Sequence, residues 1–237
     1  MTHIARLALA LLPVATVALS AQRPATDAGP PNTLTTAERA VGWRLLFDGR
    51  TTTVWRGFRK QTMPKGWQVV NGALTRVGGG GDIITKQKYK NFELAIEWNV
   101  DPGGNSGIFY RASEDDDLPW TAPEMQVVDD ARHSDGKSRL TAAGSDFGLY
   151  PAPAGIVKPA GQWNQARILV NGRHVEHWLN GVRLLQYELN SPDWEVRVMG
   201  SKFAGHPQYG RNAEGYIGLQ DHGDRVAYRS IKIRVLP

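Results

Sequence analysis

Short runs in which hydrophobic and polar residues alternate, separated by Gly, Asn, Asp and Pro, make up most of the chain after Gly42. The clearest run reads Phe-Glu-Leu-Ala-Ile-Glu-Trp over residues 92–98. Successive side chains of a strand point to opposite faces, so this run predicts a strand with one buried face. Helical periodicity is hard to find anywhere in the chain, and the pattern therefore predicts an all-β fold.

Two Asn-Gly pairs place hairpins in the second half of the chain. Residues 167–170 and 174–179 flank Asn171-Gly172, and Asn180-Gly181 follows the second of these segments. Asn-Gly is typical of the two-residue type I′ turn that joins antiparallel strands. Residues 216–220 and 229–235 have the composition of two further strands that complete the sheets. We therefore expect a sandwich of antiparallel sheets.

The first 40 residues differ from the rest. Residues 1–21 contain Arg6, an apolar run and small residues near Ala21, which together are typical of a signal peptide. The apolar run is too short for a membrane span. Residues 22–40, rich in Pro, Thr and Ala, are predicted to be a disordered linker, and 41–237 one domain. The protein is therefore expected in the periplasm or outside the cell, and without cysteine it has neither a disulfide framework nor a lipoprotein anchor.

Charge argues against one class of partner. The formal net charge of +5 becomes +4 when residues 1–21 are removed, because Arg6 is the one charged residue in that segment. Basic residues are scattered among acidic ones, whereas a nucleic-acid binder concentrates its cations to displace phosphate counterions. We predict no nucleic-acid binding.

Strand parity singles out two groups of polar residues. If Met125 and Val127 face the core, Glu124 and Gln126 face the other way. By the same argument Gln220 lies opposite the apolar residues before it, with His222 beside it. Each of these residues could simply be solvated. Together they could converge on a polar ligand such as a sugar.

Aromatic and metal-binding candidates are fewer. Trp98 is assigned to the core, whereas Trp178 shares parity with Glu176 and could stack on a sugar ring. No HExxH zinc motif, EF-hand loop, phosphate loop or nucleophile elbow is present. We predict no cofactor, although Glu, Asp and His near the expected site leave a divalent metal open.

A series of motifs in fixed order resembles the 3-keto-disaccharide hydrolase family. They are Gly42-Trp43, Leu46-Phe47-Asp48-Gly49, Asn105 to Arg111, Pro123-Glu124 with Gln126 and Asp129, Lys158-Pro159, Val175 to Gly181, Ser201-Lys202-Phe203 and Gly218 to Gly223. They span about residues 42 to 235. The chain departs from the family pattern at Ser230, and at Asp146-Phe147, where a Leu-Tyr pair is usual.

The resemblance implies a concanavalin-A-like jelly roll and a substrate. That substrate is a disaccharide or glycoside that a separate oxidoreductase has oxidised to a ketone at sugar C3. A C3 ketone acidifies the hydrogen on C2, so a base there can expel the leaving group from C1 by elimination, after which water adds. The enzyme needs a base, donors for the enolate oxygen and an acid near the leaving oxygen.

Roles follow for particular residues. Glu124 or His222 is expected to be the base and the other the acid or its orienting partner, and Lys158 a catalytic cation. The expected substrate-binding residues are Glu97, Asn105, Arg111, Gln126, Asp129, Trp178 and Gln220. Two alternatives stay open: a conventional glycoside hydrolase with Glu97 and Glu124 as its carboxylate pair, and a non-catalytic carbohydrate-binding module of the same fold.

Overall fold

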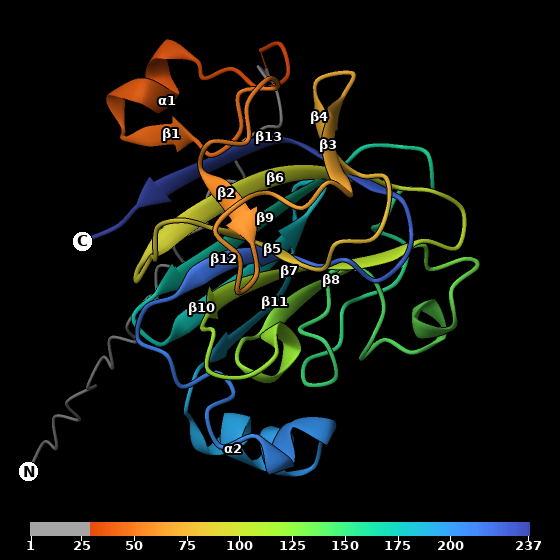
Figure 1. Cartoon of the computed structure of the whole chain (residues 1–237). Helices are drawn as coiled ribbons and strands as arrows, with labels where there is room; N and C mark the ends of the chain where they lie inside the picture. Colours follow the sequence, from red (N-terminus) through yellow and green to blue (C-terminus); the bar gives the residue numbers. More distant parts are fainter. Residues whose placement is uncertain (1–28) are drawn as a thin grey trace, which may run out of the picture.

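The computed structural model describes residues 29–237, which form two antiparallel sheets packed face to face (Figure 1). The eight-stranded sheet has the order β11 (Val182–Glu188), β10 (His174–Leu179), β9 (Asn164–Asn171), β6 (Phe92–Val100), β13 (Val226–Val235), β4 (Ala73–Arg76) and β3 (Trp67–Val70), with β1 (Trp43–Leu45) also paired to β13. The five-stranded sheet has the order β2 (Trp55–Gly57), β5 (Ile83–Thr85), β12 (Tyr216–Leu219), β7 (Asn105–Ala112) and β8 (Glu124–Val128). The predicted all-β jelly-roll sandwich is confirmed.

Helices contribute little to the fold. They are α1 (Thr36–Ala40), α2 (Pro192–Met199) and the 3₁₀ turns η1 (Leu118–Trp120), η2 (Ser134–Lys137) and η3 (Lys202–Gly205). None of the helices in residues 29–237 has the length and apolar character needed to cross a bilayer. Helix α2 packs at the end of the sandwich, away from the sheet faces (Figure 1).

The segment predicted as linker is partly structured. Thr35 caps α1, accepting a hydrogen bond from the Glu38 amide while the Glu38 carboxylate accepts one from the Thr35 amide, and Glu38 also pairs with Lys232 of β13. A capping box needs no large apolar side chains, so the composition of this segment gave no sign of it. The predicted disorder is wrong from Thr35 to Ala40, whereas the predicted signal peptide lies outside the described residues.

The alternation of apolar and polar residues along β6 determines which of its side chains lie in the core. The apolar residues of β6, from Phe92 to Trp98, are fully buried between the sheets, and the glutamates between them face outward. Both predicted hairpins form. At Asn180-Gly181 both residues have positive φ, as in a type I′ turn, whereas Asn171 still pairs within β9, so Gly172 and Arg173 make the first turn.

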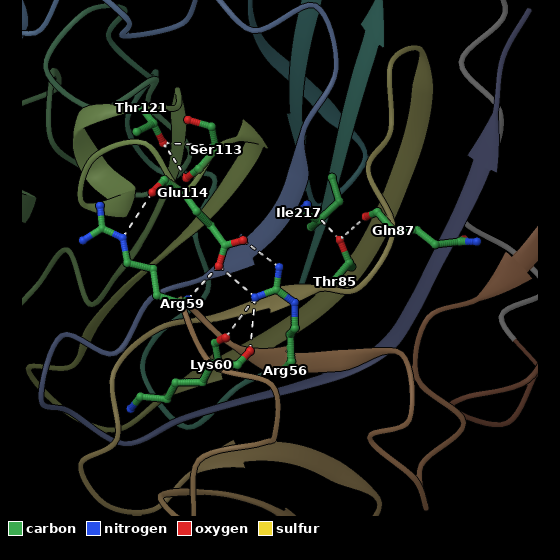
Figure 2. Close-up of polar contacts among 10 residues, drawn as sticks. Arg56, Arg59, Lys60, Thr85, Gln87, Ser113, Glu114, Thr121 and Ile217 are labelled. Atoms are coloured by element: carbon green, nitrogen blue, oxygen red, sulfur yellow. Dashed lines mark hydrogen bonds and ion pairs between the residues drawn. The ribbon is translucent and has the colours of Figure 1, made fainter.

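The loop between β7 and β8 is anchored on the outer face of the five-stranded sheet, the face turned away from the core. Arg56 of β2 holds the Glu114 carboxylate through two hydrogen bonds of 2.8 Å each, and the Arg59 amide donates to the same carboxylate (Figure 2). The Thr121 hydroxyl donates to the Ser113 and Leu118 carbonyls and so closes the loop. Leu118 then covers Phe109 and Ile84 in a small apolar cluster.

Candidate active site

Polar residues meet on the outer face of the five-stranded sheet beyond that cluster. Strand pairing places Gln126 opposite Gly107, and the backbone N–H of Gln220 donates to the Gly107 carbonyl at 3.0 Å. Met125 and Val127 are buried in the core, so Glu124 and Gln126 face outward. The predicted parity is therefore confirmed, and residues far apart in the sequence form one polar ladder across β12, β7 and β8.

Glu124 belongs to β8, the edge strand of the five-stranded sheet. Its carboxylate extends over Gly107: a Cβ atom built on Gly107 would be 1.9 Å from Glu124 Oε1, so only glycine leaves room for it. The residue is 6% exposed. The pKa of Glu124 is raised to about 8, chiefly by burial; the Lys202 ammonium opposes this rise, and the carboxylates of Asp82, Asp146 and Asp135 add to it.

Lys202 is held near Glu124 by aromatic rings. Its Nζ lies 4.2 Å from the centre of the Phe147 ring, 5.2 Å from that of Phe203 and 5.4 Å from that of Trp120. Such rings attract a cation through their negative faces. The Phe147 amide also donates to the Glu124 carbonyl at 3.0 Å, so the segment that departs from the family pattern lies directly beside Glu124.

Asp82 and Gln220 extend the ladder towards β5. Ile83 pairs with Leu219, which makes Asp82 the neighbour of Gln220. Burial raises the pKa of Asp82 to about 6, although its carboxylate accepts a hydrogen bond of 2.8 Å from the Asp221 amide. The Gln220 Oε1 atom is buried and has no hydrogen-bond donor among residues 29–237. Both side chains have polar atoms to offer a ligand.

His222 and Asn105 lie at the end of the same face. Asn105 starts β7, two residues before Gly107, and its amide group contacts His133 Nε2 at 3.4 Å and Asp135 Oδ2 at 3.0 Å. His222 packs edge-to-face against His133, with ring centres 6.0 Å apart. The ligand atoms of His133, His222 and Asp224 lie within 4.8 Å of one another, so these three residues could hold a metal ion.

Three expected site residues lie on the other sheet or at its edge. Trp178 is on the outer face of the eight-stranded sheet, where its ring lies 4.9 Å from the Arg167 guanidinium and its Nε1 donates to Glu176 at 2.6 Å. Glu97 is on that same outer face, paired with Arg229 at 2.6 Å. Lys158 is in the loop before β9, and its Nζ donates to the Trp163 carbonyl. The thickness of the sandwich separates Trp178 and Glu97 from Glu124, and strand parity alone could not reveal which sheet each strand joins.

Two others have structural contacts. Arg111, at a position of positive φ, donates to the Lys90 and Gly172 carbonyls and so ties β7 to the β9–β10 turn. Asp129 accepts hydrogen bonds from the Gly103 and Ala131 amides and shapes the loop that carries His133. Both side chains are thus engaged with backbone groups outside the polar ladder.

Sequence reasoning did not select several residues that the fold brings to this face. They are Asp82, His133, Asp135, Lys202 and Asp224. Asp82 precedes Ile84 by two residues, so strand parity places both side chains on the outer face, and this pattern could have identified Asp82 from the sequence. The others lie in loops or in the short 3₁₀ turns η2 and η3, where no periodicity predicts the direction of a side chain.

A surface cavity of about 210 Å³ lies elsewhere, beside β1, β2 and β5. It is lined mainly by apolar side chains and by the stems of Arg44 and Lys86, and it contains none of the residues described above. Perturbed carboxyl groups converge at the ladder and not at this cavity, so the ladder is the stronger candidate for chemistry.

Residues 42–234 match the family model of the 3-keto-α-glucoside-1,2-lyase-like domain. The chain belongs to this family. It is also 37% identical over 230 residues to a 3-keto-disaccharide hydrolase of Bacteroides thetaiotaomicron, an alignment that covers 83% of this chain and 79% of the relative.

Solved structures of relatives share the fold. A candidate glycosyl hydrolase from Parabacteroides distasonis has a TM-score of 0.81 and 34% identity, covering 87% of this chain and 100% of its own. A second one from the same organism has a TM-score of 0.65 and 29% identity, over 82% of this chain and 99% of its own. The predicted resemblance is confirmed, and with it the expectation of a family member that acts on glycosidic bonds.

Proposed function

We propose that this member of the 3-keto-α-glucoside-1,2-lyase-like family cleaves the glycosidic bond of a 3-keto-glycoside by elimination and hydration. The observation that carries the proposal is the buried Glu124 carboxyl, with its pKa raised to about 8, among side-chain amides on the outer face of the five-stranded sheet. A group of this kind can both remove and return a proton near neutral pH.

The reaction needs few groups. The Glu124 carboxylate takes the proton from C2, and the C–H electrons form the enolate of the C3 ketone. When the ketone re-forms, the electrons move to make a C1–C2 double bond and the C1–O bond breaks, so the leaving oxygen departs and takes up a proton. Water then adds its oxygen to C1 and a proton to C2, and the net result is hydrolysis.

Glu124 is suited to the first step because it is desolvated. A carboxylate whose pKa is about 8 is a stronger base than one in water, and about a tenth of it is ionised at pH 7. The Lys202 ammonium lies near enough to affect the Glu124 pKa, and we assign it and the Gln126 amide to the enolate oxygen. Gln220 and Asn105 would then bind sugar hydroxyls, and His222 would lie near the leaving group.

Two parts of the proposal concern the surroundings of the enzyme. The ketone must come from an oxidoreductase that oxidises the C3 hydroxyl of the glycoside, because no group on the outer face carries out redox chemistry in this scheme. The signal peptide expected in residues 1–21 would place the cleavage in the periplasm or outside the cell.

A second candidate is a conventional glycoside hydrolase, for which Asp82 supplies the specific observation. Asp82 and Glu124 lie on the same face, and their surroundings raise their pKa values to about 6 and about 8. Two carboxyls with pKa values set apart are the usual arrangement for acid and base roles. The pair Glu97 and Glu124 is not available, since the two residues face outward from opposite sheets.

The test is a product assay on a 3-keto-disaccharide and the same disaccharide unoxidised. We expect turnover of the keto form alone, and loss of about 10³-fold in kcat for Glu124→Gln. Glu97→Gln, which removes a carboxylate from the other sheet, is the matched control and should keep wild-type rates. Turnover of the plain disaccharide that depends on Asp82 would support the second candidate, and binding without turnover of either sugar would reject both.

A further inference from the structure

We infer that Trp120 is a positioning residue that holds the Lys202 ammonium beside Glu124. Lys202 begins the four-residue 3₁₀ turn η3 and is exposed, so no strand pairing fixes its side chain. No ion pair or side-chain hydrogen bond among residues 29–237 engages its ammonium, and aromatic rings lie around it instead. The position of this cation therefore depends on what fixes the rings.

Two of the three rings are fixed by the body of the domain. Phe203 is 2% exposed and stacks on Tyr209, with ring centres 4.0 Å apart. The backbone of Phe147 is hydrogen-bonded to that of Glu124, at the start of β8. Trp120 differs, because it belongs to the 3₁₀ turn η1 in the loop between β7 and β8 and is only half-buried. Its ring needs a support of its own.

His206 and Asp116 supply this support. The Trp120 ring lies parallel to the His206 imidazole, with ring centres 4.3 Å apart and an angle of 5° between the planes. The imidazole Nδ1 lies 3.1 Å from Asp116 Oδ2 and is the donor, because a carboxylate can only accept. Asp116 and Trp120 belong to the same loop, whereas His206 directly follows η3. Trp120 thus contacts η3 at both ends, at Lys202 and at His206.

The same loop leads directly to the proposed base. Trp120 precedes Glu124 by four residues. The loop is anchored at its start, where Arg56 of β2 holds the Glu114 carboxylate, and again at Thr121, whose hydroxyl bonds two carbonyls of the loop (Figure 2). An anchored loop that carries the base at its end and contacts the cation through Trp120 sets the distance between the two groups.

The catalytic use of this arrangement rests on the proposed function, whereas the position of Lys202 does not. In the proposed reaction the Lys202 ammonium stabilises the enolate, whose charge is absent from the bound substrate. An interaction made only after the substrate is bound raises kcat and leaves KM nearly unchanged. If Trp120 instead stacked on the sugar, it would bind substrate and transition state alike, and its loss would raise KM. The two roles are therefore separable.

The first measurement locates the Lys202 ammonium without any sugar. The lysines of the full chain are labelled with ¹³C-methyl groups, which keep their charge, and Lys202→Arg identifies one NMR signal. Ring currents of the three aromatic faces should place this signal upfield of the signals of lysines that face water. Trp120→Ala should move it back towards them, and Trp120→Phe should restore most of the upfield shift. His206→Ala and Asp116→Asn should move it in the same direction as Trp120→Ala.

The second measurement is a kinetic double-mutant cycle on a 3-keto-glycoside. Trp120→Ala should lower kcat by about 10- to 100-fold with KM within about twofold, and Trp120→Phe should recover most of the loss. Combined with Lys202→Met, Trp120→Ala should cause no further loss, because a residue that acts through Lys202 then has nothing to position. Trp163→Ala is the matched control and should keep wild-type kinetics. Its ring also packs on a cation, with the Arg229 guanidinium 4.0 Å from the ring centre, but at the other sheet.

The outcomes distinguish this inference from the proposed function. Circular dichroism of each variant excludes unfolding as the cause of a change. A Lys202 signal that coincides with those of the lysines facing water, or that Trp120→Ala leaves in place, would overturn the inference. A kinetic loss confined to KM, or one that persists in full beside Lys202→Met, would also overturn it. Absence of turnover by the wild type would overturn the proposed function instead, and the NMR signals would still decide what holds Lys202.

Discussion

Replacing Glu124 by Gln should make the protein more stable at alkaline pH while removing its activity. Glutamine keeps the shape of the side chain but cannot ionise. In the wild type the folded chain holds a proton on Glu124 up to about pH 8, whereas the unfolded chain releases it near the ordinary value of 4.5. The folded-state pKa is thus raised, so the stability linked to this proton is complete below pH 4.5 and is lost as pH rises through about 8.

The size of the effect follows from the shift. Each pKa unit corresponds to 1.36 kcal/mol, so a rise from 4.5 to about 8 is worth about 5 kcal/mol at the upper limit. For a domain of this length 1 kcal/mol moves Tm by about 2–4 °C. The variant should therefore unfold about 10–20 °C above the wild type at pH 9, with a much smaller difference at pH 5.

The assay is urea unfolding of both proteins at half-unit steps from pH 5 to pH 9. The informative quantity is the difference in unfolding free energy between the two proteins as a function of pH, because titrating groups that are independent of Glu124 affect both proteins and cancel. That difference should grow with pH. A difference that stays constant across the range would refute the claim that the Glu124 carboxyl is desolvated in the folded state, and with it the main support for its role as base.

Four other outcomes are expected. Gly107→Ala puts a Cβ 1.9 Å from Glu124 Oε1 and should lower kcat/KM on a 3-keto-glycoside by about 100-fold with an unchanged circular dichroism spectrum; wild-type kinetics would show that the carboxyl position is unimportant. The kcat/KM of the wild type should rise with pH and level off above about pH 8. Lys202→Met should move this rise to higher pH, because the Lys202 ammonium lowers the pKa of Glu124. A kcat/KM that instead falls as pH rises through about 8 would make Glu124 the acid. Trp178→Ala should leave KM within about twofold, because the ring lies on the other sheet; a larger rise would return Trp178 to the site. Mass spectrometry of the exported protein should find a mature chain starting near Gln22, and a retained N-terminus would contradict the signal peptide.

Much of the architecture could be predicted from local patterns. Alternation along residues 92–98 predicted which side chains of β6 are buried, and Asn180-Gly181 predicted a hairpin turn, because both depend on neighbours only a few residues away. The same reasoning placed Glu124 and Gln126 on the face opposite Met125. The capping box at Thr35 was missed, since composition alone suggested disorder there.

The sequence by itself determined the class of fold, the family and the outward direction of Glu124, because strand parity and ordered motifs are properties of the chain. The tertiary structure alone decided which outward faces coincide. Strands β6 and β10 join one sheet and β8 the other, so Glu97 and Trp178 lie across the sandwich from Glu124. Loops bring His133 and Asp224 to the Glu124 face, and the 3₁₀ turn η3 brings Lys202. Strand parity says nothing about side chains outside strands, and the pairing of distant strands is fixed only when the two sheets bury their common core.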